Sequence, residues 1–139
     1  MPTSQNASID FLVPVSIGEV VDKITILRIK QQEILDPAKL INIKSELTAL
    51  EQSYHDHAGT PSELVRNLTG ELQSINQKLW HIEDDLRDLE RSQNFGNEFV
   101  ELARAVYFTN DERARLKREI NIALGSTLFE EKSYAAYTQ

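Results

Sequence analysis

A run of leucine and isoleucine residues between positions 64 and 89 constrains the fold of this chain more than any other feature. Eight apolar side chains follow one another at spacings of three or four residues: Leu64, Leu68, Leu72, Ile75, Leu79, Ile82, Leu86 and Leu89. A mean period of about 3.5 residues is typical of a helix that buries one stripe of side chains in a coiled-coil-like seam. The pattern therefore predicts one long helix, of about 30 residues, over roughly residues 61–93.

Residues that cap helices divide the rest of the chain. We expect helix starts at Ser16, at Asp36 before Pro37, at Thr60 before Pro61 and at Thr109, because hydroxyl and carboxylate side chains accept from free amides there. Gly125 predicts a helix end. The expected helices cover about 17–35, 37–57, 61–93 and 96–124, the last either continuous or broken at Thr109.

These elements predict an all-α fold, an antiparallel helical bundle or hairpin with a short extended lead-in at residues 11–15. The short connection at Gly59 and Thr60 predicts that helices 37–57 and 61–93 form the hairpin. The helix at 61–93 is longer than its predicted neighbour, so its far half must pack on the other helices or on a second copy. A homodimer is therefore expected. We assign residues 1–10 to a flexible N-terminus and residues 11–139 to a single domain.

Composition and charge exclude several classes of protein. The formal net charge of −7 argues against a nucleic-acid partner, because such proteins need a basic face. The chain has no cysteine, which excludes disulfides and thiolate metal sites. No apolar run reaches the roughly 20 residues of a membrane span. We expect no membrane insertion and, because residues 1–10 do not resemble a signal peptide, a cytoplasmic location.

A second stripe of side chains accompanies the leucine seam on the same helix. It contains Asn76, Trp80, Glu83, Arg87 and Glu90. One interpretation is that Trp80 covers the edge of the core while the charged residues form a solvated face. The other is that the stripe is a contact surface for a helix or a ligand, with Trp80 as its apolar anchor.

Cationic side chains fall on helix faces that otherwise look buried. Arg28 projects near the middle of the apolar face of helix 17–35, and we expect Glu71 or Glu83 to neutralise it, because an unpaired buried charge is costly. Polar residues also occupy the inward face of the last helix: Asn110, Arg113, Lys117 and Asn121.

We therefore expect a cluster centred on Glu83. Its predicted members are Arg28, Arg87, Arg113, Lys117, Asn76, Asn121 and Tyr107. The cluster is either an interhelical network of salt bridges or a site for a phosphate or carboxylate, which arginine binds in a bidentate manner.

Signals for catalysis are weak. Glu19 and Asp22 form a carboxylate pair on one helical face, as in all-α nucleotide pyrophosphohydrolases that bind magnesium, but the order and spacing of that family's motif are not matched. His55 and His57 are two residues apart, so they point to different sides of a helix. No nucleophilic triad or glycine-rich phosphate loop is present in the sequence. We expect no cofactor and no metal.

Several blocks of the sequence, taken in order, resemble a known family. They are residues 13–19 (VPVSIGE), 22–27 (DKITIL), 79–87 (LWHIEDDLR), 110–118 (NDERARLKR), 120–121 (IN), 125–126 (GS) and 130–134 (EEKSY). Together they resemble DUF6165, a bacterial and phage family without an assigned activity, over about residues 11–137. Members of that family tend to occur near, or fused to, glycosyltransferase and tetratricopeptide modules. The resemblance therefore implies a role in surface-polysaccharide metabolism and gives no catalytic residue.

Two hypotheses about function follow. The first is a non-enzymatic helical module, dimeric, that docks on a partner protein such as a glycan-assembly enzyme. The second is a small enzyme or binder of an anionic metabolite, such as a sugar nucleotide or sugar phosphate, at the cationic cluster. They differ in whether Arg113 and Lys117 line an open cleft or are consumed in salt bridges.

Overall fold

The computed structural model describes residues 9–137, which contain four α-helices and no strand. The helices are α1 (Ile17–Glu33), α2 (Pro37–Ala58), α3 (Glu63–Arg91) and α4 (Asn97–Leu124). The predicted all-α fold is confirmed. With 29 residues α3 is the longest helix, about 43 Å long at 1.5 Å per residue. The predicted flexible N-terminus covers residues 1–10, and its first eight positions lie outside the described part of the chain.

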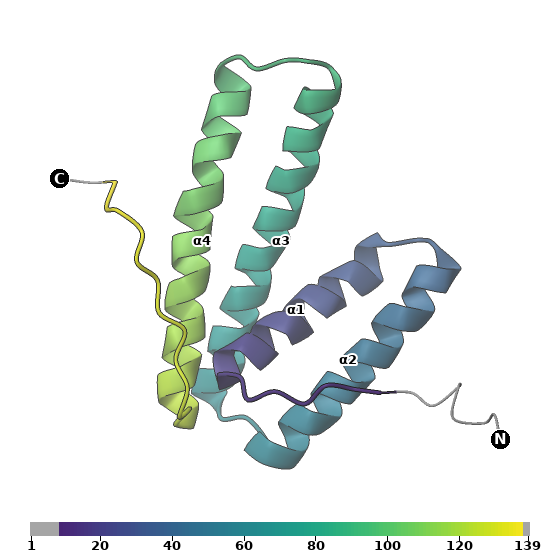
Figure 1. Cartoon of the computed structure of the whole chain (residues 1–139), viewed down its shortest axis with the longest axis vertical. Coiled ribbons are helices and arrows are strands. Elements are labelled where there is room, and N and C mark those ends of the chain that lie inside the picture. Colours follow the sequence, from purple (N-terminus) through teal and green to yellow (C-terminus); the bar gives the residue numbers. More distant parts are fainter. Residues whose placement is uncertain (1–8, 138–139) are drawn as a thin grey trace.

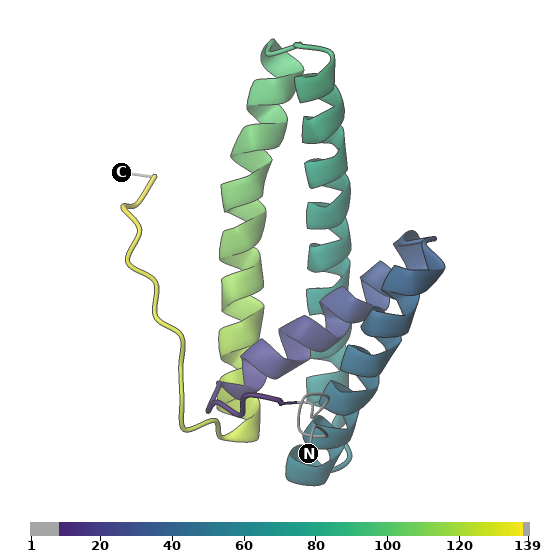
Figure 2. The same cartoon turned by 45° about the vertical axis from the view of Figure 1, so that its right-hand side comes forward.

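The helices form two antiparallel pairs, α1 with α2 and α3 with α4 (Figure 1). Helix α1 crosses the lower half of the α3–α4 pair and packs against all three other helices (Figure 2). The prediction that α2 and α3 form the hairpin is wrong. The apolar face of α2 is used against α1, so α3 leaves the connection at Gly59 in another direction and pairs with α4.

Three helices begin at side-chain caps. The Ser16 hydroxyl accepts from the Glu19 amide and the Asp36 carboxylate accepts from the Ala38 amide, as predicted. Helix α3, however, begins two residues later than expected, because Ser62 rather than Thr60 caps it by accepting from the Val65 amide.

The break considered at Thr109 does not occur. Thr109 is buried inside a continuous α4, where packing outweighs the preference of threonine for helix starts. Gly125 ends α4 in the left-handed conformation, with φ of 68°.

The leucine seam of α3 is largely buried. Leu68 and Leu72 join one core cluster with Val21 of α1 and with Leu116 and Ile120 of α4. Leu64 is the exception, 59% exposed, because the start of α3 turns Val65 inward instead. The far half of the seam, beyond α1, packs against the antiparallel α4 (Figure 1). The length of α3 is thus explained within one chain.

A second core cluster lies between α1 and α2. Ile24 and Leu27 of α1 pack there against Ile43 and Leu47 of α2. Helix α1 therefore buries two faces, one against α2 and one against α3 and α4. None of the described helices has the length and apolar character that a membrane crossing would need.

Helices α1 and α4 approach each other closely at Gly18. Its amide donates to Asn121 Oδ1 at 2.6 Å, and a Cβ atom here would collide with the main-chain oxygen of Lys117 and lie 2.9 Å from Asn121 Oδ1. Two backbones can approach this closely only where one residue lacks a side chain.

We predict that Gly18→Ala destabilises the protein by about 1–3 kcal/mol, because the main-chain atoms it meets cannot move aside cheaply. Urea unfolding followed by far-UV circular dichroism measures the change. Gly70→Ala on α3 is the matched control. No atom lies within 4 Å of the Cβ it would add, so it should stabilise by about 0.5–1 kcal/mol. Equal effects at both positions would contradict the close approach of α1 and α4.

Candidate functional site

A buried carboxylate, Asp22, lies where α1 crosses α3 and α4. It is 1% exposed. Arg113 of α4 binds it in a bidentate manner, with Nε 3.0 Å from Oδ1 and Nη2 on Oδ2. Asn76 of α3 donates to the same Oδ1 from 2.8 Å. One side chain of α1 is therefore held by both helices of the other pair.

The polar contacts extend along one stripe of α1. Gly18, Asp22, Thr25 and Ile29 succeed one another at helical spacing, and all four are buried. The Thr25 hydroxyl accepts from Asn76 at 2.9 Å and donates to the main-chain oxygen of Asp22. Within residues 9–137 no buried side-chain nitrogen or oxygen lacks a hydrogen-bond partner. The interior network is therefore saturated.

Lys117 extends this network toward the surface. It is 8% exposed, and its Nζ lies 2.7 Å from Glu19 Oε2, 3.2 Å from Glu130 Oε2 and 3.8 Å from Asp22 Oδ2. Burial by itself would lower the pKa of Lys117, but the hydrogen bond to Glu19 and the charge of Asp22 leave it above the ordinary value. Lys117 therefore stays protonated and bridges α1, α4 and the segment after α4.

Arg113 is fixed by the same carboxylate. Its hydrogen bond to Asp22 outweighs burial and raises the pKa of the guanidinium. Such a bidentate pair leaves few donors for anything else. The arrangement holds helices together and has the character of a structural ion-pair network.

The predicted cluster is therefore centred on Asp22, and the prediction that placed Glu83 at its centre is wrong. Asn76, Arg113, Lys117 and Asn121 do come together, at the crossing of α1 with α3 and α4. Glu83 instead lies on the exposed side of α3, where it pairs with Arg87 one turn away at 2.5 Å. A carboxylate from α1 itself supplies the charge that the inward cations need.

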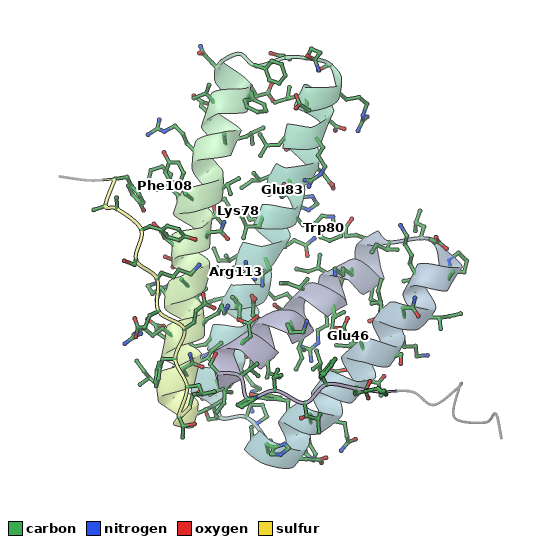
Figure 3. All side chains as sticks on the ribbon, in the orientation of Figure 1. Glu46, Lys78, Trp80, Glu83, Phe108 and Arg113 are labelled. Atoms are coloured by element: carbon green, nitrogen blue, oxygen red, sulfur yellow. The ribbon has the colours of Figure 1, made fainter. Side chains whose placement is uncertain are left out.

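The predicted partners of Arg28 are also wrong. Its Nη2 lies 2.9 Å from Glu51 Oε2 on α2, in a half-exposed pair. Neither Glu71 nor Glu83 is near, because this side of α1 faces α2 rather than α3. The neighbouring pair of Lys23 with Glu46 also joins α1 to α2, and Glu46 is labelled on α2 in Figure 3.

Tyr107 lies apart from the cluster, on the outer side of α4. Its ring contacts Phe108 and Tyr137, with centroids 4.9 and 5.3 Å away. Figure 3 shows Phe108 on the side of α4 along which residues 127–137, the C-terminal segment, run back. Asn110 lies between these regions, lining both the hollow under that segment and the groove described next.

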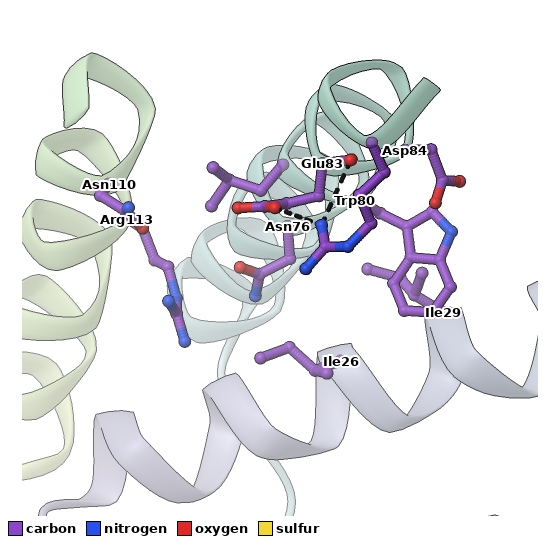
Figure 4. A pocket seen from close by; sticks show the side chains of 10 residues that line it. Ile26, Ile29, Asn76, Trp80, Glu83, Asp84, Asn110 and Arg113 are labelled. Atoms are coloured by element: carbon purple, nitrogen blue, oxygen red, sulfur yellow. Dashed lines mark hydrogen bonds and ion pairs between the residues drawn. The ribbon is translucent and has the colours of Figure 1, made fainter. Parts of the chain in front are cut away.

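An open groove lies above the crossing, between α1, α3 and α4 (Figure 4). Its volume is about 470 Å³. We call it the Trp80 groove, and its lining residues are Ile26, Ile29, Asn76, Leu79, Trp80, Glu83, Asp84, Arg87, Asn110 and Arg113. Trp80 is half-buried at one wall, next to Ile29 (Figure 4). The predicted second stripe of α3 thus borders a real concavity.

The most important residue of the site, Asp22, was absent from the predicted cluster. Its pairing with Glu19 in the sequence resembled a weak magnesium motif. Within residues 9–137 no group of three or more histidine and acidic side chains is placed to hold a metal ion. The signal that could have identified Asp22 is the spacing of Gly18, Asp22, Thr25 and Ile29, which defines a second inward face of α1.

We predict that Asp22→Asn destabilises the protein by roughly 3 kcal/mol, because it leaves the partly buried Arg113 and the buried Lys117 without their shared counter-charge. Denaturant unfolding at neutral pH measures the loss. Glu83→Gln removes the same charge from an exposed pair and should cost less than about 1 kcal/mol. A similar small loss for both variants would show that Asp22 is not structural.

The C-terminal segment should be held by Glu130. Glu130→Gln breaks its pair with Lys117, so we predict several-fold faster tryptic cleavage after Lys132, measured by mass spectrometry. Glu131→Gln, which affects only the exposed pair with Arg118, should change the rate little.

Acid should also release the C-terminal segment, because it protonates Glu130. Burial by itself would raise the pKa of Glu130, but the hydrogen bond from Lys117 leaves this pKa below its ordinary value in the folded chain. The attachment is therefore complete above the ordinary glutamate pKa and is lost as the pH falls through the lowered value. Equal cleavage of both variants and the parent protein would contradict this attachment.

Comparisons with known proteins place the chain at the level of a family. No curated protein and no solved structure matches it. A family of unknown function, DUF6165, matches residues 11–138. This range covers nearly all of the described residues and includes both Asp22 and the Trp80 groove. The chain belongs to the DUF6165 family.

Proposed function

We propose that this protein is a non-enzymatic helical module that acts by protein–protein contact, as a homodimer, in support of a partner in glycan assembly. The observation that carries the proposal is that all four cations of the predicted ligand site are paired with carboxylates of the same chain. The pairs are Arg28–Glu51, Arg87–Glu83, Arg113–Asp22 and Lys117–Glu19. A phosphate would have to compete with these carboxylates for every one of the four cations.

The Trp80 groove supports the contact function. Its floor is apolar, formed by Ile26, Ile29 and Leu79, and Trp80 provides a large side chain at the wall. Glu83 and Arg87 form a charged rim. An aromatic anchor within an apolar centre and a polar rim is the usual composition of protein interfaces. The partner class itself, an enzyme of surface-polysaccharide assembly, follows from the family resemblance.

A second candidate function is binding of an anionic metabolite in the same groove. Its volume of about 470 Å³ lies in the range of small-molecule sites, roughly 300–1,000 Å³. Arg87 favours this alternative, because its side chain is 69% exposed and only its Nη1 contacts Glu83. The contact function is favoured because Arg113, the other cation that lines the groove, is already bound by Asp22.

We predict no thermal shift with millimolar UDP-glucose, glucose 1-phosphate or inorganic phosphate, measured by differential scanning fluorimetry. A ligand at 100 times its dissociation constant would stabilise the fold by about 2.7 kcal/mol, a readily detected effect. Arg87→Ala is the informative variant, since this exposed side chain is not part of the core. Stabilisation of the parent protein that disappears in Arg87→Ala would contradict the contact function and establish the metabolite site.

A further inference from the structure

The segment that precedes α1 exposes a run of large apolar side chains. We call residues 9–15 the lead-in. Ile9, Phe11, Leu12 and Val13 are 82%, 92%, 93% and 67% exposed. Elsewhere, exposed aliphatic side chains such as Ile41 and Ile122 are isolated on helix surfaces, which is ordinary. A continuous exposed apolar run indicates a surface that is covered in the functional state.

The main chain of the lead-in also lacks backbone partners in the described part of the chain. Within residues 9–137, no backbone–backbone hydrogen bond involves residues 9–15. The lead-in therefore offers both apolar side chains and free main-chain groups. Extended segments with these two properties bind into grooves that supply apolar contacts and hydrogen-bonding side chains.

The Trp80 groove supplies both. Its apolar floor can take Phe11 and Leu12, and Asp84 and Asn110 on its walls can accept and donate hydrogen bonds to a main chain. The one charged residue of the lead-in is Asp10, and the rim of the groove carries Arg87. Arg87 contacts Glu83 through Nη1 alone, so its remaining N–H groups are available to a second carboxylate.

The lead-in and the groove of one copy lie on different sides of α1. In Figure 1 the lead-in runs below α1 and across α2. The groove lies above α1, against α3 (Figure 4). The start of α1, which the lead-in joins, is fixed in this orientation. The amides of Ile17 and Gly18 donate to the side chains of Ser126 and Asn121 near the end of α4. Each copy thus presents an uncovered apolar segment and an unfilled apolar groove that do not meet.

We propose that the lead-in of one copy occupies the Trp80 groove of a second copy, and that the exchange is reciprocal. This inference rests on the proposed homodimer and specifies its interface. Each copy then contributes one segment and one groove, so the assembly closes as a two-fold dimer and does not grow into a filament. Phe11 and Leu12 insert between Trp80 and Ile26, and Asp10 pairs with Arg87.

The protein carries its own probe of this contact, because Trp80 is its only tryptophan. Light scattering after size exclusion and tryptophan emission should be recorded from high micromolar to nanomolar protein. We expect the mass of two chains and blue-shifted emission at high concentration, with both reverting together on dilution. Phe11→Ser with Leu12→Ser should give a monomer at all these concentrations, whereas Ile41→Ser, at an isolated exposed position, should leave the dimer unchanged.

A mixing experiment tests the exchange itself. The double variant Phe11→Ser with Leu12→Ser, the lead-in variant, keeps an intact groove. Ile26→Asp keeps an intact lead-in but places a carboxylate in the floor of the groove. Each variant alone should be monomeric. The mixture should form a dimer in which the lead-in of Ile26→Asp occupies the groove of the other variant. Only the Trp80 emission of that other variant should then shift. If Ile26→Asp does not fold by circular dichroism, Arg87→Glu at the exposed rim replaces it.

The outcomes separate this inference from the proposed function. A dimer that survives Phe11→Ser with Leu12→Ser overturns the exchange but keeps the homodimer. Failure of the mixture to associate also overturns the exchange, since it points to an interface other than segment in groove. A monomer at every concentration overturns both. Shifted emission that is independent of concentration and lost in the lead-in variant shows that the lead-in folds into the groove of its own copy, which overturns the exchange.

Discussion

A single buried carboxylate organises this protein. Asp22 is removed from water at the point where α1 crosses α3 and α4, and a charge in that position is tolerated only when other groups answer it. Arg113 and Asn76 do so from two different helices, so the position of α1 on the α3–α4 pair is specified. Helix α2 packs mainly on α1. The placement of both helix pairs therefore depends on the surroundings of one side chain.

Because Arg113 and Lys117 are paired with carboxylates of the same chain, a functional surface should be sought elsewhere on the molecule. Arginine and lysine side chains on inward helix faces are equally the residues of an anion site and of an internal salt-bridge network, and their pairing distinguishes the two. Here Arg113 and Lys117 neutralise carboxylates of α1. The Trp80 groove above them and the uncovered lead-in do remain open to other molecules, and both of these features favour contact between proteins.

The sequence predicted well what is set by local chemistry. The seam from Leu68 to Leu89 gave α3, and the caps at Ser16 and Asp36 gave two helix starts to the residue. The sequence-based prediction failed for features that contacts between distant parts of the chain determine. Helix pairing was wrong because the apolar face of α2 suits α1 as well as α3. The cluster was centred on Glu83 because this carboxylate lies on the second stripe of α3, next to Asn76 and Arg87. Only the arrangement of the helices shows which carboxylate meets Arg113, although the buried stripe through Gly18, Asp22 and Thr25 was already visible in the spacing.

The coupling free energy between Asp22 and Arg113 tests the central claim most directly. It is obtained from the unfolding free energies of the parent protein, Asp22→Asn, Arg113→Gln and the double variant. If this pair fastens α1 to α4, the coupling should reach about 2 kcal/mol or more, as in buried networks. A coupling below about 0.5 kcal/mol, as in exposed ion pairs, would contradict a structural role and return both side chains to the list of groups free to bind a ligand.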